Sequence, residues 1–95
     1  MAGYVVIELD IFDKEKLREY QRVAPEIIKK YGGEIIVRGG EALSLEGSWD
    51  PERVVMIKFP TYAKAQEWWH SPEYIEAKKL KEKGAFSNLV IFEGV

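Results

Sequence analysis

The sequence contains no cysteine and a single histidine, His70. Without cysteine, the chain forms no disulfide and offers neither a thiol nucleophile nor a thiolate ligand for a metal. A metal site of the usual kind needs several His or Cys side chains, so we expect no metal and no cofactor. Haem ligation by His70 stays open as an alternative, although no motif supports it.

The sequence also lacks an excess of charge of either sign and a long hydrophobic run. Its 14 basic and 16 acidic residues give a net charge of −2, whereas nucleic-acid binding needs a basic field. No apolar stretch approaches the ~20 residues that cross a bilayer, and the start, MAGYVVIELD, does not resemble a signal peptide. We therefore expect a cytoplasmic protein with no nucleic-acid or membrane partner.

Apolar residues, by contrast, are plentiful. Of the 95 residues, 46% are hydrophobic and 13% are aromatic, which suits a globular core and argues against disorder. A chain of this length has room for one core only, so residues 1–95 are predicted to form a single domain.

Hydrophobic periodicity and turn residues predict four strands and two helical regions. The strands are expected at residues 4–9, 34–38, 53–59 and 88–93. One helix begins at a cap, Asp13, and runs to residue 31; the second region has two pieces, 62–70 and from Ser71 to about residue 83. The order strand–helix–strand–strand–helix–strand is typical of the ferredoxin-like α+β fold with a four-stranded antiparallel sheet.

Two local features add expectations of their own. Pro25 removes a backbone donor inside the first helix, which predicts a kink or a break there. After the second strand, Gly39-Gly40 forms either a hairpin turn or a bulge. We favour the bulge, with one long strand continuing through residues 42–46, because the stronger turn signal is GSWDPE at residues 47–52.

Alternation along the strands predicts one wholly apolar face and one mixed face of the sheet. The mixed face is expected to carry Tyr4, Val6, Glu8, Ile36, Arg38, Val54, Met56 and Lys58. The helices can cover only one face, and the mixed face has more contiguous apolar surface than a monomer leaves in water. We therefore expect a homodimer that packs sheet against sheet about a two-fold axis.

Five segments also carry a resemblance to a known family. They are GYVVIELDIFD (residues 3–13), YGGEIIVRGGE (31–41), LEGSWDPERVVMIKFP (45–60), SPEY (71–74) and LVIFEG (89–94). In this order and spacing the chain resembles the domain-of-unknown-function 1330 family of the dimeric α/β-barrel (ferredoxin-like) superfamily. One position departs from the family pattern: Lys81 stands where members often have arginine, so a carboxylate there would meet a point charge rather than a bidentate fork.

The resemblance implies a two-fold dimer whose facing sheets form a barrel, and it implies no established reaction. The superfamily includes cofactor-free monooxygenases, haem enzymes, isomerases of small cyclic acids and ligand-sensing domains. A fold shared by such different proteins does not select among their functions.

The segment WWHSPEY, residues 68–74, concentrates rare residues at a predicted corner between two helices. Trp68 and Trp69 point about 100° apart on a helix, so one is expected in the core and the other beside a cleft. His70 falls on the polar side and is interpreted as structural. Ser71 is predicted to cap the next helix, with Pro72 at its first position.

The second candidate region surrounds the turn after the second strand. Arg38, on the mixed face before two glycines, is the best single candidate for binding a carboxylate or enolate oxygen, although an intersubunit salt bridge is the favoured role for it. Glu46 and Arg53 either pair across the hairpin base or orient a ligand. Trp49 acts either as a lid or as an aromatic that closes the partner interface.

These observations favour a homodimer with a small-molecule pocket between sheet and helices. The predicted ligand-binding residues are Tyr4, Arg38, Trp68, Trp69 and Tyr74. Any chemistry would be cofactor-independent proton or oxygen transfer on a small organic acid or aromatic compound. The alternative is a non-enzymatic module that binds a metabolite or a protein, because no nucleophile, metal set or acid/base pair is recognisable. No catalytic residue is assigned.

Overall fold

The computed structural model describes all 95 residues, and it has four strands and three helices. In chain order they are β1 (Gly3–Ile11), α1 (Lys14–Lys30), β2 (Glu34–Arg38), β3 (Arg53–Phe59), α2 (Tyr62–His70), α3 (Pro72–Glu82) and β4 (Ala85–Glu93). The strands lie in the order β2-β3-β1-β4, and every neighbouring pair is antiparallel. The predicted ferredoxin-like α+β fold is confirmed, and within one chain the sheet stays open.

Each helix begins at a polar residue that satisfies a free backbone N–H. The side chains of Asp13, Thr61 and Ser71 accept hydrogen bonds from the backbone N–H three residues further on, at 3.1, 3.0 and 3.1 Å. Such caps are worth about 1 kcal/mol each. The three predicted helix starts are therefore confirmed.

The end of α1 is a glycine-dependent stop. Gly32 has a φ of 83°, in the left-handed region that glycine adopts without a steric penalty. Its N–H bonds to the Lys29 carbonyl at 3.0 Å, and the Gly33 N–H bonds to the Ile28 carbonyl at 2.9 Å. This pair of bonds is the Schellman arrangement, which satisfies carbonyls that the helix itself leaves free.

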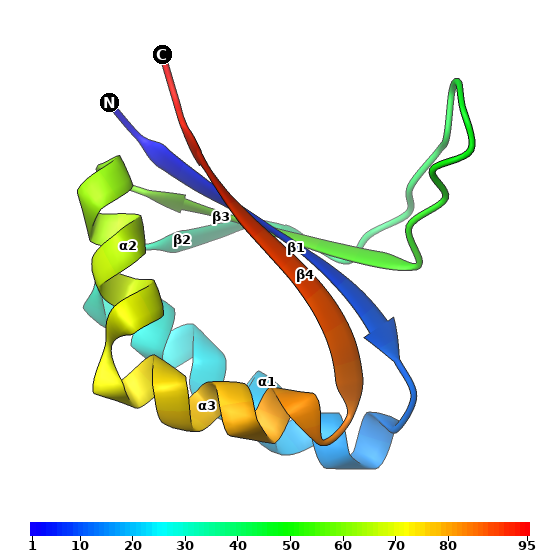
Figure 1. The fold of residues 1–95 in the computed structure, drawn as a ribbon, viewed down its shortest axis with the longest axis horizontal. Coiled ribbons are helices and arrows are strands. Elements are labelled where there is room, and N and C mark those ends of the chain that lie inside the picture. The colour runs from blue at the N-terminus through cyan, green and yellow to red at the C-terminus, as the bar shows by residue number, and fades with distance from the viewer.

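Of the kink or break expected at Pro25, the break is absent, because helix α1 continues from Lys14 to Lys30. The long strand expected after Gly39-Gly40 is wrong. Residues 42–46 form no strand, because β2 ends at Arg38 and its partner β3 begins only at Arg53. Gly39, with a φ of 59°, turns the chain away after its N–H has bonded to the Val54 carbonyl at 2.8 Å. The loop that follows arches away from the body (Figure 1).

The core lies between the sheet and the helices, which all cover the same face (Figure 1). The β1 row Val5, Ile7 and Leu9 is 0%, 3% and 5% exposed. Apolar residues of α1 at spacings of three and four pack onto it, as the helical periodicity predicted. The predicted apolar face of the sheet is thus the one that the helices cover.

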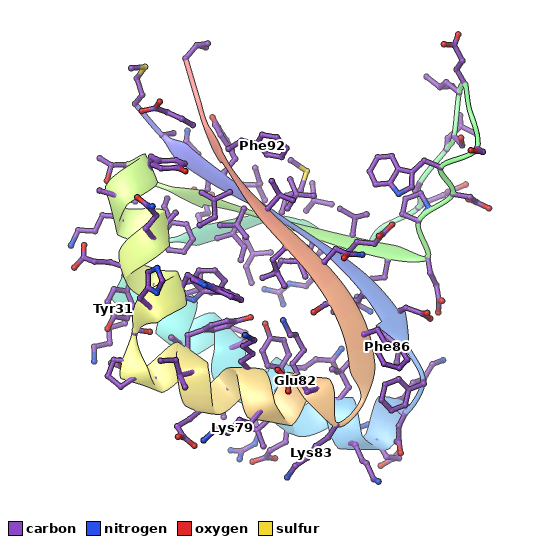
Figure 2. The ribbon with its side chains drawn as sticks, in the orientation of Figure 1. Tyr31, Lys79, Glu82, Lys83, Phe86 and Phe92 are labelled. Atoms are coloured by element: carbon purple, nitrogen blue, oxygen red, sulfur yellow. The ribbon has the colours of Figure 1, made fainter.

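The opposite face of the sheet, which we call the open face, carries no helix. One continuous row crosses all four strands, because Val6 pairs with both Met56 and Val90, and Met56 pairs with Val37. Val37, Val90 and Phe92 remain 39%, 49% and 55% exposed. Figure 2 labels Phe92 and Phe86 towards opposite ends of β4. In a single chain, the open face therefore exposes a continuous row of apolar side chains.

None of the three helices combines the length with the hydropathy that a membrane crossing requires.

Candidate functional site

Arg38 lies on the helix-covered side of the sheet because β2 contains a bulge. Ile35 pairs with Ile57, but the next paired residue is Val37, opposite Met56, so one residue of β2 is left over. The slip places Arg38 opposite Val55, and directly paired residues share a face of the sheet. The expectation that Arg38 faces the mixed side is therefore wrong.

Arg38 contributes to a cavity between the sheet and α1, which we call the arginine cavity. Its volume is about 380 Å³, at the lower end of the ~300–1,000 Å³ typical of small-molecule sites. Its polar side chains are Tyr20, Gln21, Arg38 and Arg53. Its apolar wall consists of Ile7, Leu9, Ala24, Pro25, Ile28, Ile35, Val55 and Ile57. Two cations thus stand beside a largely apolar wall.

Arg53, in the wall of the arginine cavity, has an unsatisfied donor. Its Nε is buried and has no hydrogen-bond partner. Neither Arg53 nor Arg38 belongs to any ion pair, so the pairing of Arg53 with Glu46, one of the two alternatives for these residues, is not formed. A Cβ on Gly39 would lie 2.7 Å from Arg53 Nε. The stem of Arg53 therefore lies directly across Gly39, and only glycine leaves room for it.

Tyr20 in the wall of this cavity is the first member of a buried polar chain. The hydroxyl oxygens of Tyr20 and Tyr74 lie 3.1 Å apart, and Lys81 Nζ lies 3.4 Å from the Tyr74 hydroxyl. All three side chains are at most 7% exposed. We call this set, Tyr20, Tyr74 and Lys81, the phenol–amine chain. It crosses the core from α1 to α3.

Burial changes the proton affinities within this chain. It raises the pKa of both tyrosine hydroxyls, so each remains a protonated phenol, and either can be the donor of the bond between them. Burial lowers the pKa of Lys81 to about 8; the charge of Lys78 acts in the same direction, and Glu82 opposes it. No carboxylate forms an ion pair with Lys81. The amine therefore changes charge close to neutral pH.

The second end of the chain reaches another cavity, which we call the lysine cavity. Its lining includes Lys81, Lys78 and Glu82 from α3, Trp69 from α2 and part of β4. The Lys78 ammonium lies 4.7 Å from the centre of the Trp69 ring, a cation–π arrangement. The lysine cavity is thus more polar than the arginine cavity, and Lys81 forms part of its wall.

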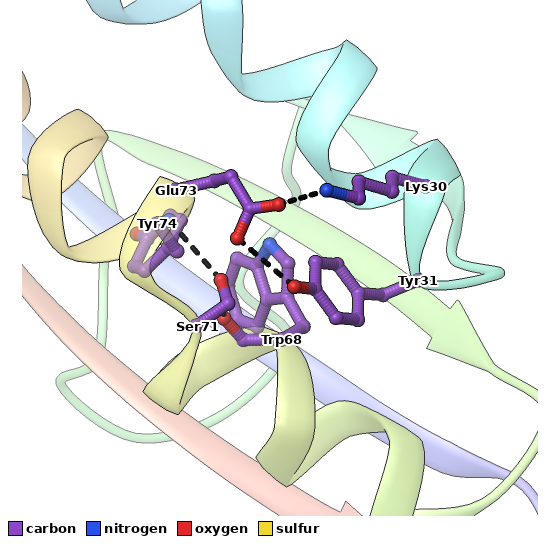
Figure 3. Close-up of polar contacts among 6 residues, drawn as sticks. All are labelled: Lys30, Tyr31, Trp68, Ser71, Glu73 and Tyr74. Atoms are coloured by element: carbon purple, nitrogen blue, oxygen red, sulfur yellow. Dashed lines mark hydrogen bonds and ion pairs between the residues drawn. The ribbon is translucent and has the colours of Figure 1, made fainter.

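The corner at residues 68–74 is mainly structural (Figure 3). Ser71 Oγ donates to the Trp68 carbonyl at 2.7 Å and accepts from the Tyr74 N–H at 3.1 Å, so it joins the end of α2 to the start of α3. Glu73 accepts a hydrogen bond from the Tyr31 hydroxyl at 3.0 Å and forms an ion pair with Lys30. The hydrogen bonds from Lys30, the backbone and Tyr31 lower the pKa of Glu73 to about 2.

The five residues predicted to bind a ligand do not share one site. Arg38 lies in the arginine cavity and Trp69 in the lysine cavity. Trp68 and Tyr74 are fully buried in the core, with their ring centres 4.2 Å apart. Tyr4 pairs with Lys58 and Phe92 and lies on the open face. The expected division of the two tryptophans between core and cleft is confirmed.

The long loop after β2 contacts the open face at one point. Trp49 Nε1 donates to Glu8 at 2.7 Å, and Asn88 Nδ2 donates to the other carboxylate oxygen at 3.2 Å. Glu8 is therefore held between the loop and β4. Trp49 itself remains 63% exposed.

Lys81 and Tyr20 were not among the predicted site residues, although the sequence held a signal for one of them. Tyr74, Ala77 and Lys81 are the buried residues of α3, and their spacing of three and four marks one helix face. A lysine at an apolar position of that face indicates a buried amine. Tyr20 lay in the apolar stripe of α1 and gave no comparable signal.

The topology, the helices on one face and the cavity beneath them define a ferredoxin-like α+β protein. The family model described as "Domain of unknown function (DUF1330)" matches residues 2–95. The chain therefore belongs to this family, as the resemblance of its segments implied. No curated protein matches the chain.

Solved structures of similar fold have low sequence identity to the chain. A protein of unknown function from Rhodopseudomonas palustris is 19% identical, with a TM-score of 0.75 over 99% of this chain and 82% of that chain. SnoaB, a cofactor-independent oxygenase from Streptomyces nogalater, is 9% identical, with a TM-score of 0.70 over 99% and 93% of the chains. A dimeric ferredoxin-like protein of unknown function from Jannaschia sp. CCS1 is 11% identical, with a TM-score of 0.70 over 99% and 100%.

Proposed function

We propose that the arginine cavity binds a small organic acid whose carboxylate pairs with Arg38 and Arg53. The observation that carries this proposal is the buried Arg53 Nε, which has no acceptor. A buried donor without a partner destabilises the fold by about 1–3 kcal/mol, and a carboxylate is the acceptor that arginine binds most strongly. The apolar wall suits an aromatic or aliphatic body on the same molecule.

The chemistry that this arrangement supports best is cofactor-independent proton or oxygen transfer on the bound acid. A cofactor-independent oxygenase has the same fold. A rival function, non-enzymatic binding of a metabolite, is favoured by one specific observation: no carboxylate or histidine lines the arginine cavity to act as a general base. Binding of the acid is common to both functions, so it is the first step to test.

We further propose that the protein acts as a cytoplasmic homodimer joined through the open face. The support is the uncovered apolar row across the sheet and the dimeric state of the similar Jannaschia protein. The arginine cavity lies on the other side of the sheet, so a partner on the open face leaves it accessible.

The test of ligand binding is calorimetric titration with 3-phenylpropanoate, which carries one carboxylate and one ring. Arg38→Gln and Arg53→Gln should each weaken binding about 10- to 100-fold, because each removes a charge-assisted hydrogen bond worth ~1.5–3 kcal/mol. The control is Arg22→Gln, which removes a charge from the exposed side of α1 that pairs only with Glu19. Equal affinity for all four proteins, or no binding by the wild type, contradicts the proposal.

For proton transfer, turnover separates the enzyme from the binding module. In D₂O, an enzyme for proton transfer should accelerate exchange of the α-protons of phenylpyruvate, followed by NMR, above the buffer rate. A binding module should bind phenylpyruvate and leave the exchange rate at that of the buffer.

A further inference from the structure

The phenol–amine chain is a continuous path of hydrogen-bonding groups between the two cavities. It begins at Tyr20, in the wall of the arginine cavity, passes through the Tyr74 hydroxyl and ends at Lys81, which lines the lysine cavity. Each hydroxyl has one proton to donate, so the direction of the whole chain is set at its two ends. A new acceptor or a new proton at one end therefore reverses the hydrogen bonds at the other end.

Few other charged groups act on the amine at the end of this path. On α3, Lys78 and Glu82 face it with opposite signs. From α1 the Tyr20 phenol faces it, 6.0 Å from Lys81 Nζ to the ring centre. Trp69 of α2 and the lining residues of β4, Ala85 to Leu89, carry no titratable side chain. The protonation of Lys81 is thus governed chiefly by the chain and by these two neighbours.

The donor-to-acceptor direction of the hydrogen bonds differs between two states of the chain. When Lys81 is neutral the bonds run from Tyr20 towards Lys81, and when an anion is bound they run from Lys81 towards Tyr20. With a neutral amine, Tyr20 donates to Tyr74 and Tyr74 donates to the Lys81 lone pair. With an anion in the arginine cavity, Tyr20 donates to the anion, Tyr74 donates to Tyr20, and the Lys81 ammonium donates to Tyr74. Bonds aligned in one direction polarise and strengthen one another.

We propose that Tyr20 is a third binding group for the organic anion in the arginine cavity, and that binding of the anion draws a proton onto Lys81. The proton comes from water through the lysine cavity, and no covalent bond to the ligand is made or broken. This inference rests on the proposed function and specifies it: the preferred ligand is an organic anion whose oxygen reaches Tyr20 as well as the two arginines.

The test measures protons taken up when 3-phenylpropanoate binds. Titrations at pH 8.5 in two buffers of different ionisation enthalpy, Tris and borate, give the number of protons bound per ligand. Since Lys81 titrates at a pKa of about 8 in the free protein, most of it is neutral at this pH. The wild type should take up a large fraction of one proton at pH 8.5 and almost none at pH 6.5.

Four variants test whether the proton uptake depends on the phenol–amine chain or only on the negative charge of the ligand. Tyr74→Phe interrupts the chain and keeps the ring, and Lys81→Met removes the amine, so both should abolish the uptake. Lys78→Met removes a lysine from the same cavity that forms no hydrogen bond with the tyrosines; because Lys78 lowers the pKa of Lys81, its loss should reduce the uptake at pH 8.5 without abolishing it. Tyr20→Phe should abolish the uptake and also weaken binding about tenfold or more, the value for a hydrogen bond to a charged group.

The outcomes distinguish this inference from the proposed function. Binding without proton uptake at pH 8.5 overturns the inference alone. Uptake that persists in Tyr74→Phe also overturns it, because the anion then acts on Lys81 through space. Absence of any binding by the wild type overturns the proposed function and this inference together. Circular dichroism confirms that each variant is folded, and Tyr74→Phe decides the question if Lys81→Met is not.

Discussion

At the scale of single residues, Lys81 is the feature least like an ordinary globular core. Its side chain is 1% exposed, and its amine contacts a phenol rather than a carboxylate. A buried charge without a counterion opposes folding, and the usual response of the group is a shifted pKa. At neutral pH most Lys81 side chains are charged, so this residue destabilises the fold. A destabilising residue in the core indicates a role other than stability. That role, in our proposal, is to respond to an anion.

Lys81→Met should therefore stabilise the free protein at pH 7, in spite of removing a hydrogen bond. The pKa of Lys81 falls from 10.5 in the unfolded chain to about 8 in the fold. A lowered pKa for an amine means that the unfolded chain binds more protons between these values, so wild-type stability rises as pH increases from about 8 to 10.5. The variant lacks this rise.

Urea unfolding of both proteins between pH 7 and 10.5 checks this sign. The advantage of Lys81→Met at pH 7 should be on the order of 2 kcal/mol once solvent screening is allowed for, and it should shrink through pH 8–10.5. Comparison with Lys78→Met removes the contribution of a general loss of positive charge. A difference between Lys81→Met and wild type that stays constant over this range would contradict the account.

At the scale of the elements, the helix starts and the order of strands were predictable, whereas the face of Arg38 was not. Asp13, Thr61 and Ser71 are local signals that act within three residues. The bulge in β2 has no local signal, because adjacent Ile35, Ile36 and Val37 suit either face. Only pairing with β3 selects the slipped register, and a slip of one residue reverses the face of all that follows.

The strand expected at residues 42–46 is absent for a related reason. ALSLE alternates apolar and polar residues like a strand, but no neighbouring strand is present to pair with it. A strand depends on a partner for its backbone hydrogen bonds, whereas a helix makes them internally. Alternation by itself is therefore weaker evidence than a helix cap.

The turn that ends β2 should matter for binding more than for folding. In Gly39→Ala the new methyl group meets Arg53 at Nε, Cγ and Cζ, all within 3.0 Å, and it should displace that side chain from the arginine cavity. Affinity for 3-phenylpropanoate should fall severalfold or more. The left-handed backbone adds about 1–2 kcal/mol of destabilisation.

Gly47→Ala is the matched control for this variant. Gly47 also has a positive φ, 84°, but nothing lies within 4 Å of its Cβ position. It should lose similar stability in urea unfolding and bind 3-phenylpropanoate with wild-type affinity. Unchanged affinity in Gly39→Ala would mean that the position of Arg53 does not determine binding.

At the scale of the whole molecule, the sheet separates two surfaces with different roles. The helix-covered side holds the arginine cavity and the phenol–amine chain, and the open face holds the apolar row. Because side chains of adjacent residues in a strand point to opposite faces, Val55 lines the cavity while Val54 and Met56 belong to the open face. If the two proposals hold, association through the open face and ligand binding should therefore respond independently to substitution.

Val90→Lys should convert the proposed dimer into a monomer without abolishing ligand binding. Val90 lies midway along the edge strand β4, at one end of the apolar row of the open face, and a lysine there would place an unpaired charge against the partner's apolar sheet. Light scattering should then report one chain of 11.0 kDa in place of two. Ile75→Lys is the control, because Ile75 on α3 is as exposed as Val90, at 48% against 49%, but lies on the helical side. It should remain dimeric.

The same monomeric variant also tests the separation of the two surfaces. If the arginine cavity is complete within one chain, Val90→Lys should bind 3-phenylpropanoate with an affinity within about twofold of the wild type, since distant and independent sites perturb each other by only ~0.5 kcal/mol. Its stability should no longer rise with protein concentration, as a dimer's does. A monomer that has lost ligand binding would mean that the partner chain completes the site, and a wild type that is already monomeric would remove the open face as the dimer interface.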